Sequence, residues 1–405
     1  MIRLVLAALL LLAAGPGRAA ELGADLCATL AQRVDAIPGD GPLFLRSFDA
    51  AAGQGAPPEP ALAGAAFTYD NALAIIALTA CGDVAQATRI GAALLSATVL
   101  DRAGPDAARL RNVYRAGAQK QYPIPPNGWW DEAERRWLED DYQVGSATGN
   151  VAWAGLALLT LAQATGEARF AAGAATLGRW VRERTADARG PGGFTGGVHG
   201  FDATPVTVRW KSTEHNVDLV ALFAWLQRID PAGGWGKPEG QARGFVTAMF
   251  DKPGGRFLIG TVEDGVTINH TVSALDTQLW PLLLGGADPQ WRAAAAYARR
   301  THLVDGGYDF NEDRDGVWTE GTGQAALVEK LLGRRDEAAR LLARVARERS
   351  PGGYLFAASV PRLSTGLAAE SSADLAYFRV PHLGATCWAV LAALGWNPFI
   401  GRTLP

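Results

Sequence analysis

Residues 146–185 read SATGNVAWAGLALLTLAQATGEARFAAGAATLGRWVRERT, and this stretch contains the unit that decides the fold. From Val151 to Leu161 the side chains are apolar on every face, which is typical of a buried helix. Gly166 and Glu167 then interrupt the pattern. Residues 168–185 mix apolar and charged side chains with the period of an amphipathic helix. The stretch therefore predicts a hairpin of two helices, with the first in the interior and the second on the outside.

The same unit recurs along the chain. Further helix pairs are predicted at 71–81 and 83–100, 213–229 and 238–250, 273–284 and 288–302, and 320–332 and 335–348. Helices 21–37 and 382–394 remain at the two ends, and they can form a sixth pair by closing a ring. Short turns lie within the pairs, whereas long loops rich in Trp, Tyr, Asp and Glu lie between them. Function is therefore expected on the side of the long loops.

This arrangement resembles the six-hairpin α/α toroid shared by inverting glycosidases, some polysaccharide lyases and sugar epimerases. The resemblance covers nearly all of residues 21–405 and is one of architecture rather than of a diagnostic motif. It implies an all-α (α/α)6 toroid of about twelve helices in one catalytic domain. It also implies an active site at the mouth where the inner helices begin. Residues 256–262 and 266–269, on either side of Asp264 and Gly265, predict a small β-hairpin insertion.

The N-terminus predicts export. Arg3 is followed by an apolar run from Leu4 to Ala14 and by small residues up to Ala20, which is the pattern of a signal peptide over residues 1–20. We therefore expect a periplasmic or secreted protein without a membrane span in the mature chain. The formal net charge is −3, without a basic stripe, so nucleic acid is not an expected partner. The sequence does not indicate an oligomeric state.

The chain has three cysteines, Cys27, Cys81 and Cys387, all in apolar helical contexts. This context favours buried free thiols, with one disulfide among them as the alternative. Catalytic thiol chemistry is not expected, because none of the three has a polar, activating neighbourhood.

The densest polar cluster is RWKSTEHNVD at residues 209–218. Ser212 or Thr213 can cap the helix that starts there, and an ordinary helix start is the alternative interpretation. A cap needs only one polar side chain, however, and this turn holds several. Glu214 is our candidate general acid, and Lys211, His215 and Asn216 are candidates for binding the substrate.

A second acidic cluster, WLEDDYQ at residues 137–143, precedes the helix predicted to start at Ser146. Asp141 is the candidate base, with Asp140 beside it, and a solvated acidic loop is the alternative. Aromatic rings stack on sugars in apolar clefts, so Tyr142, Trp129 and Trp130 are expected to bind the substrate. Substrate contacts are also predicted at the starts of other inner helices, from Tyr69, Asp70, Gln278, Trp318 and His382. Asp70 as a helix cap and His382 as a structural residue are the alternatives there.

Glu320 is a third candidate catalytic carboxylate, but it has a competing role. Asp309, Asn311, Asp313 and Asp315 are spaced like the ligands of an EF-hand calcium loop, with Glu320 at the twelfth position. Arg314 stands where that loop requires glycine, and Gly316 comes two residues late. The pattern predicts either a structural calcium site, in which Glu320 is a ligand, or a plain acidic turn. No cofactor is otherwise required.

Convergent carboxylates and aromatic rings favour an inverting glycoside hydrolase that cleaves a poly- or oligosaccharide with a general acid and a general base. A polysaccharide lyase is the first alternative, with Tyr142, His215, Asn216 and Lys211 as its polar groups. A carbohydrate-binding protein of an exopolysaccharide system is the non-catalytic alternative. An epimerase fits an export signal less well.

Overall fold

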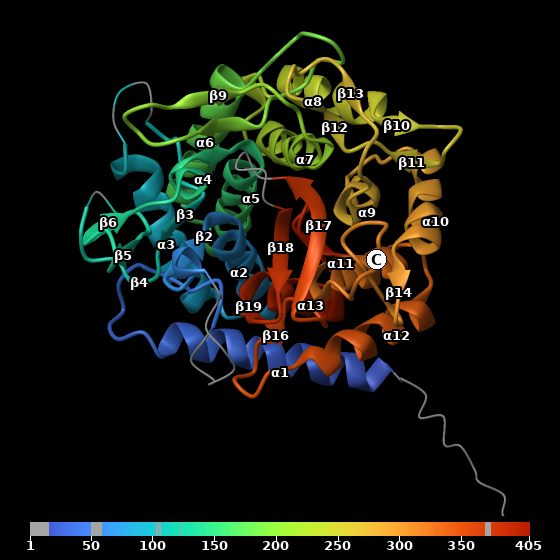
Figure 1. Cartoon of the computed structure of the whole chain (residues 1–405), viewed down its shortest axis with the longest axis horizontal. Helices are drawn as coiled ribbons and strands as arrows, with labels where there is room; N and C mark the ends of the chain where they lie inside the picture. Colours follow the sequence, from blue (N-terminus) through green and yellow to red (C-terminus); the bar gives the residue numbers. More distant parts are fainter. Residues whose placement is uncertain (1–15, 50–58, 103, 105–106, 123, 369–373) are drawn as a thin grey trace, which may run out of the picture.

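The computed structural model describes residues 16–49, 59–102, 104, 107–122, 124–368 and 374–405. Their helices form two concentric rings (Figure 1). Each helix of the inner ring packs against the next one, and the last packs against the first, so the ring is closed. The inner helices are α2 (Thr68–Cys81), α5 (Thr148–Thr165), α7 (Thr213–Ile229), α9 (Leu275–Leu283), α11 (Thr319–Leu331) and α13 (Leu383–Leu394).

The outer ring covers this barrel. Each outer helix packs on an inner one, and the predicted pairing of the first and last helices is confirmed by the contact of α1 with α13. The resemblance to an (α/α)6 toroid therefore gave the correct fold. The outer helices are α1 (Pro16–Asp35), α3 (Val84–Leu100), α6 (Ala168–Arg184), α8 (Gly236–Ala248), α10 (Arg292–Thr301) and α12 (Arg335–Val345).

Apolar content decides which ring a helix joins. In α5, every residue from Val151 to Leu161 is buried, because the helix contacts both ring neighbours and the outer layer. In α12, by contrast, only one face is buried. Gly82, Gly166 and Gly395 end α2, α5 and α13 in the left-handed conformation that glycine adopts without steric cost.

A disulfide joins the two rings. Cys27 of α1 is bonded to Cys81 at the end of α2, 54 residues away, whereas Cys387 is a buried free thiol in α13. The expectation of three free thiols is therefore wrong, and the alternative of one bridge is correct. Sequence context did not reveal the bridge, because the two cysteines meet only when α1 closes the ring.

Short strands fill the connections on the side where the inner helices begin. The predicted hairpin is confirmed between β12 (Gly260–Thr261) and β13 (Ile268–Asn269), but β11 (Arg256–Phe257) pairs with β10 (Phe250–Asp251) instead. A longer antiparallel hairpin, β17 (Arg362–Ala368) with β18 (Asp374–Phe378), was not predicted. Figure 1 shows it extending across the centre of the ring.

The remaining elements are short. A four-residue helix, α4 (Asp141–Val144), stands before α5. β7 (Ser146–Ala147), β8 (Gly197–His199) and β9 (Val206–Val208) form a three-stranded sheet. The other strands pair in twos: β1 (Leu43–Phe44) with β4 (Gly117–Ala118), β2 (Ala65–Phe67) with β3 (Val113–Arg115), β5 (Trp129–Asp131) with β6 (Arg136–Leu138), β14 (Leu303–Val304) with β15 (Gly307–Tyr308), β16 (Leu355–Phe356) with β19 (Pro381–His382), and β20 (Trp396–Asn397) with β21 (Arg402–Thr403).

Among the described residues, no helix is both long and apolar enough to span a bilayer. Most of the predicted signal peptide, residues 1–15, lies outside the described part of the chain. The signal peptide therefore stays a prediction.

Candidate active site

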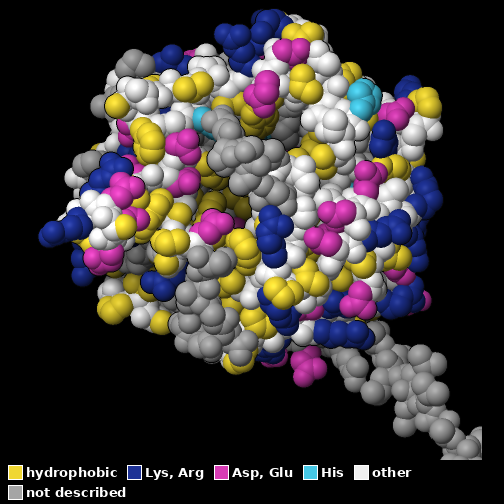
Figure 2. Space-filling view, in the orientation of Figure 1, with side chains coloured by type: hydrophobic (Ala, Val, Ile, Leu, Met, Phe, Trp, Pro, Cys, Tyr) yellow, Lys and Arg dark blue, Asp and Glu magenta, His cyan; other side chains and the backbone are white. Residues whose placement is uncertain are grey.

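The first turns of the inner helices meet at one mouth of the barrel. Figure 2 shows a hollow at the centre of this face, with hydrophobic side chains in its depth and acidic side chains at its margin. Four of the carboxylates from these helices are at most 5% exposed, and Glu214 is half-buried. The five carboxylates, which we call the central carboxylates, are Asp70 of α2, Glu214 and Asp218 of α7, Asp276 of α9 and Glu320 of α11.

Local hydrogen bonds fix where the inner helices start. Thr68, Thr148 and Thr213, each the first residue of its helix, donate a side-chain hydrogen bond to a backbone carbonyl of another segment. The Ser212 hydroxyl also accepts a hydrogen bond from the His215 amide and caps α7, so Glu214 lies in the first turn. The polar clusters thus cap helices, and the same geometry brings their carboxylates to the mouth.

Glu320 is held by a chain of hydrogen bonds across the mouth. The Tyr69 hydroxyl donates to Glu320 Oε1 at 2.6 Å and accepts from Trp388 Nε1 at 2.8 Å. The His382 ring lies on the other side, with Nε2 3.4 Å from Asp70 Oδ2 and Nδ1 3.8 Å from Glu320 Oε2. This arrangement fixes one Glu320 oxygen and places a titratable imidazole beside the other.

Gly384 makes this cluster sterically possible. A Cβ at this position would lie 2.7 Å from Asp70 Oδ1 and 2.9 Å from Glu320 Oε2. Gly149 has the same role at the opposite side, since a Cβ there would lie 2.4 Å from His215 Cδ2 and 3.2 Å from Asp218 Oδ2. Each glycine therefore leaves space for functional side chains from neighbouring helices.

Burial raises the pKa values of the Glu214, Asp276 and Glu320 carboxyl groups. Burial, together with the charges of Asp276 and Glu320, raises the pKa of Glu214 well above its ordinary value. Burial raises the pKa of Asp276 to about 6, against the lowering effect of the Thr277 amide. Burial also raises the pKa of Glu320 to about 7, although the charge of His382 and the Tyr69 hydroxyl favour the ionised form.

The pKa values of His382 and His215 are shifted in opposite directions. Burial alone lowers the pKa of His382, but the nearby Asp70 and Glu320 carboxylates together outweigh it, and the pKa is raised above the ordinary value. Burial lowers the pKa of His215 to about 4, so this ring is neutral near pH 7. The mouth therefore contains an imidazole that favours the cationic form next to Glu320 and a neutral imidazole next to Asp218.

Several buried polar atoms on the inner helices have no hydrogen-bond partner among the described residues. They include both carboxylate oxygens of Asp218, Glu320 Oε2, both amide atoms of Gln324 and the indole nitrogen of Trp280. Gln324 lies one helical turn after Glu320 and so shares its face of α11. Each unpaired buried polar group costs about 1–3 kcal/mol. A ligand rich in hydroxyl groups, or ordered water, would satisfy them.

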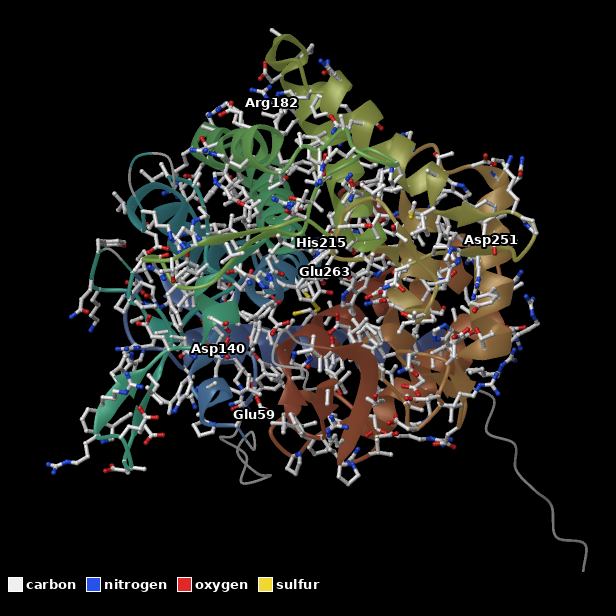
Figure 3. All side chains as sticks on the ribbon, turned by 45° about the horizontal axis from the view of Figure 1, so that its top comes forward. Glu59, Asp140, Arg182, His215, Asp251 and Glu263 are labelled. Carbon is white, nitrogen blue, oxygen red and sulfur yellow. A yellow bond between two sulfur atoms is a disulfide. The ribbon has the colours of Figure 1, made fainter. Side chains whose placement is uncertain are left out.

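Several residues predicted from the sequence do meet here. Tyr69, Asp70, Glu214, Glu320 and His382 belong to the cluster described above. His215 packs on Trp210 with ring centroids 5.5 Å apart, and Figure 3 shows it near the middle of the molecule, far from Arg182 and Asp251 at the periphery. The exposed Tyr142 ring packs edge-on against His199 with ring centroids 6.0 Å apart, and His199 packs edge-on against Trp210, so Tyr142 lies close to the mouth.

Asp218 was not among the predicted site residues. Asp218 follows Glu214 by four residues and therefore lies on the same face of α7, which is a signal that the sequence already contained. Asp276 is the second residue of α9. Both are central carboxylates of the mouth, and both interact electrostatically with Glu214.

Asp141 does not join the central carboxylates. It is exposed, and its Oδ1 accepts a hydrogen bond from the adjacent Tyr142 amide. Asp140 caps α4 by accepting from the Gln143 amide at 2.9 Å. The short helix α4 causes this difference, because it delays the start of α5 to Thr148 and leaves Asp141 on the rim. The structure therefore does not support Asp141 as the base.

Other predicted binding residues belong to the framework. Asn216 bonds to both the amide and the carbonyl of Phe194, and Gln278 does the same with Phe257. Lys211 Nζ is buried and donates to the Arg189 carbonyl at 2.7 Å. Their polar groups hold the connections in place, so we assign them structural roles.

The predicted tryptophans do not line the mouth. Trp318 is 1% exposed and packs against Phe310 beneath β18, so it has no face for a sugar. Trp129 and Trp130 are on the β5–β6 hairpin, which Figure 1 shows at the margin of the ring. They line the outer rim rather than the mouth.

Comparisons with known proteins support the fold. No protein-family model and no curated protein matches the chain. A glycosidase variant solved in complex with glucose has a TM-score of 0.61 at 16% identity, over 94% of this chain and 98% of that one. Cellobiose 2-epimerase from Spirochaeta thermophila has a TM-score of 0.63 at 14% identity, over 93% and 96%.

A third solved structure is similar over the same extent. The glycoside hydrolase family 76 mannosidase from Bacteroides thetaiotaomicron has a TM-score of 0.58 at 12% identity, over 93% of this chain and 98% of that one. The chain thus has the (α/α)6 toroid fold found in these enzymes. At such low identity the likeness establishes the fold, and the reaction must be argued from the site.

Proposed function

We propose that this chain is a carbohydrate-active enzyme, specifically an inverting glycoside hydrolase that cleaves a poly- or oligosaccharide. One observation carries the proposal: Glu214 and Glu320 reach the same mouth from α7 and α11, and only Glu320 has neighbours, the Tyr69 hydroxyl and His382, that favour its ionised form. A pair of carboxyl groups whose pKa values are pushed apart is the usual basis for assigning acid and base.

Glu214 is the general acid in this proposal. Burial and the charges of Asp276 and Glu320 raise its pKa and so favour the protonated carboxyl, and it is the one central carboxylate that is not fully buried. It can therefore donate its proton to the leaving glycosidic oxygen. Such a proton donor contributes about 10²- to 10⁴-fold to the rate.

Glu320 is the general base. Burial raises its pKa to about 7, but the hydrogen bond from Tyr69 and the neighbouring His382 both favour its ionised form, and Oε2 has no hydrogen-bond partner among the described residues. This free oxygen can accept a proton from water that attacks the anomeric carbon on the face opposite the leaving group. Inversion requires carboxyl groups about 6.5–9.5 Å apart, which leaves room for that water.

Export is part of the proposal. The predicted signal peptide of residues 1–20 is supported by the Cys27–Cys81 disulfide, because disulfides persist mainly in oxidising compartments. We therefore place the enzyme in the periplasm or outside the cell.

A sugar epimerase is the second candidate. His199, His215 and His382 lie in or beside the mouth, and both His199 and His215 pack against the Trp210 ring. Imidazoles exchange protons near neutral pH, and two epimerases share the fold. A polysaccharide lyase is less well supported, since the central carboxylates would repel an acidic sugar.

The test is a panel of neutral and acidic polysaccharides incubated with the purified protein and scored for new reducing ends. Glu214→Gln should lower turnover at least about 10²-fold on any substrate found, whereas the exposed Glu132→Gln should leave it unchanged. Unchanged turnover in Glu214→Gln would refute the acid assignment. An isomerised sugar without new chain ends would indicate epimerisation, and an unsaturated product absorbing in the ultraviolet would indicate a lyase.

A further inference from the structure

A second group of carboxylates lies outside the mouth, in the loop between β15 and α11. Asp309, Asp313 and Asp315 each direct an oxygen to a common point, and these oxygens lie within 4.8 Å of one another. Oxygens that bind one Ca²⁺ at 2.3–2.6 Å fall within this spacing. Asp309 is fully buried, whereas Asp313 and Asp315 are exposed.

Asp309 provides a separate indication of a ligand. Its Oδ1 accepts a hydrogen bond from the Phe310 amide at 2.7 Å, but the buried Oδ2 has no hydrogen-bond partner among the described residues. A buried carboxylate oxygen that faces two further carboxylates is unfavourable without a compensating charge. A cation at the common point would supply that charge.

The backbone has the conformation expected of a calcium loop that starts at Asp309. The sixth position of such a loop makes a sharp turn, which is why glycine usually stands there. Arg314 occupies that position with a φ of +60°, which is in the left-handed region. Its guanidinium donates to the carbonyls of Arg300 and Thr301 at the end of α10, and these bonds hold the turn.

Glu320, the twelfth residue of the loop, is not a ligand here. Its carboxylate accepts the hydrogen bond from Tyr69 and belongs to the central carboxylates. Glu320 therefore belongs to the mouth and not to the calcium loop, because α11 begins at Thr319 and directs the Glu320 side chain toward the mouth. Backbone carbonyls and water would complete the six to eight oxygens that Ca²⁺ requires.

We propose that Asp309, Asp313 and Asp315 bind Ca²⁺ and that the ion secures the β17–β18 hairpin across the mouth. Asp315 Oδ2 accepts a hydrogen bond from the Ser364 amide of β17 at 2.9 Å. Tyr377 of β18 packs on Trp318, three residues after Asp315, with ring centroids 5.3 Å apart. The ion would therefore stabilise both the base of the hairpin and the start of α11. This proposal does not depend on the identity of the reaction.

The test uses the full protein with Ca²⁺, Mg²⁺ or EDTA. For a Ca²⁺ concentration about 100 times the dissociation constant, we expect the melting temperature to rise by about 2–4 °C relative to EDTA. Tb³⁺, which binds at calcium sites, should luminesce when tryptophan is excited, because Trp318 is part of the same segment. Mg²⁺ should have a much smaller effect, since it requires near-octahedral geometry.

The double variant Asp313→Asn/Asp315→Asn should lose both signals. Asparagine keeps the oxygens that accept from the Asp315 and Ser364 amides, so the variant should still fold in EDTA with a melting temperature near that of the wild type. The control Glu132→Gln/Glu263→Gln removes the same charge from exposed sites and should keep both signals. A Ca²⁺ effect that persists in the double variant, its absence in the wild type, or an equal effect of Mg²⁺ would overturn the proposal.

Discussion

Replacing Tyr69 by phenylalanine tests the arrangement that assigns Glu320 its role. The hydroxyl donates to Glu320 Oε1 at 2.6 Å and accepts from Trp388 Nε1 at 2.8 Å. Tyr69→Phe keeps the ring, which packs edge-on against Trp153, and removes both hydrogen bonds. The change therefore leaves an indole N–H and a carboxylate oxygen without their partner in a buried site.

The expected decrease in the free energy of unfolding follows from the loss of these two hydrogen bonds. A hydrogen bond to a charged group contributes about 1.5–3 kcal/mol, and leaving a buried donor unpaired costs about 1–3 kcal/mol. Because a water molecule can occupy part of the vacated space, we expect Tyr69→Phe to lower the free energy of unfolding by about 2–4 kcal/mol at pH 8. The loss should be smaller at pH 5.5, where Glu320, with a pKa of about 7, is protonated.

The pKa of Glu320 should also change. The Tyr69 hydroxyl favours the ionised carboxylate, so its removal should raise this pKa further and shift the acidic limb of kcat/KM to higher pH. Urea unfolding at pH 5.5 and 8, together with a pH–rate profile, measures both effects. Tyr308→Phe, at a buried tyrosine on β15, is the control. The reasoning would be refuted if Tyr69→Phe lowered the free energy of unfolding no more than Tyr308→Phe does and left the acidic limb of the kcat/KM profile in place.

Two further predictions concern stability alone. Asp218→Asn should raise the free energy of unfolding relative to the wild type, and by more at pH 8 than at pH 4, because folding holds a proton on Asp218 that the unfolded chain loses above about pH 3.9. Cys27→Ala/Cys81→Ala should lower the free energy of unfolding by about 4 kcal/mol, the loop-entropy value for a 54-residue separation.

The sign of the pH effect follows from the raised pKa of Asp218 in the folded protein. Wild-type stability falls as the pH rises above about 3.9, the pKa of an unfolded aspartate, toward the raised pKa of Asp218. His215, with a folded pKa of about 4, changes stability in the opposite direction, but only below its unfolded value near 6.5. Urea titrations at several pH values follow the slope. Asp40→Asn, at an exposed site, should keep the wild-type slope, and an equally steep slope in Asp218→Asn would contradict the prediction.

The disulfide prediction has its own internal control. Reduction of the wild type by dithiothreitol should lower the free energy of unfolding by the same amount as the double alanine variant. Reduction should not affect that variant further, because Cys387 is a free thiol. A wild type that is insensitive to the reductant in urea unfolding would show that the bond contributes nothing.

Some of the site could be predicted from the sequence, because inner helices begin with polar side chains that serve as caps. Glu214, Glu320, Tyr69, Asp70 and His382 were found for that reason. Spacing could not show that Asn216 and Gln278 pair with backbone groups of connecting segments, since those partners lie 22 and 21 residues away. Nor could it show that α4 would separate Asp141 from the mouth.

The ring of helix pairs follows from the pattern of apolar residues along the chain. A helix that is apolar on all faces must be surrounded by protein, and an amphipathic helix beside it must face water, so the alternation along the chain specifies two concentric layers. The folded structure was needed to show which carboxylates share the mouth, which two cysteines are bonded and where Glu320 points. Those outcomes depend on contacts between segments as far apart as Tyr69 and Trp388, whose approach is set by the closure of the ring and leaves no periodic signal in the chain.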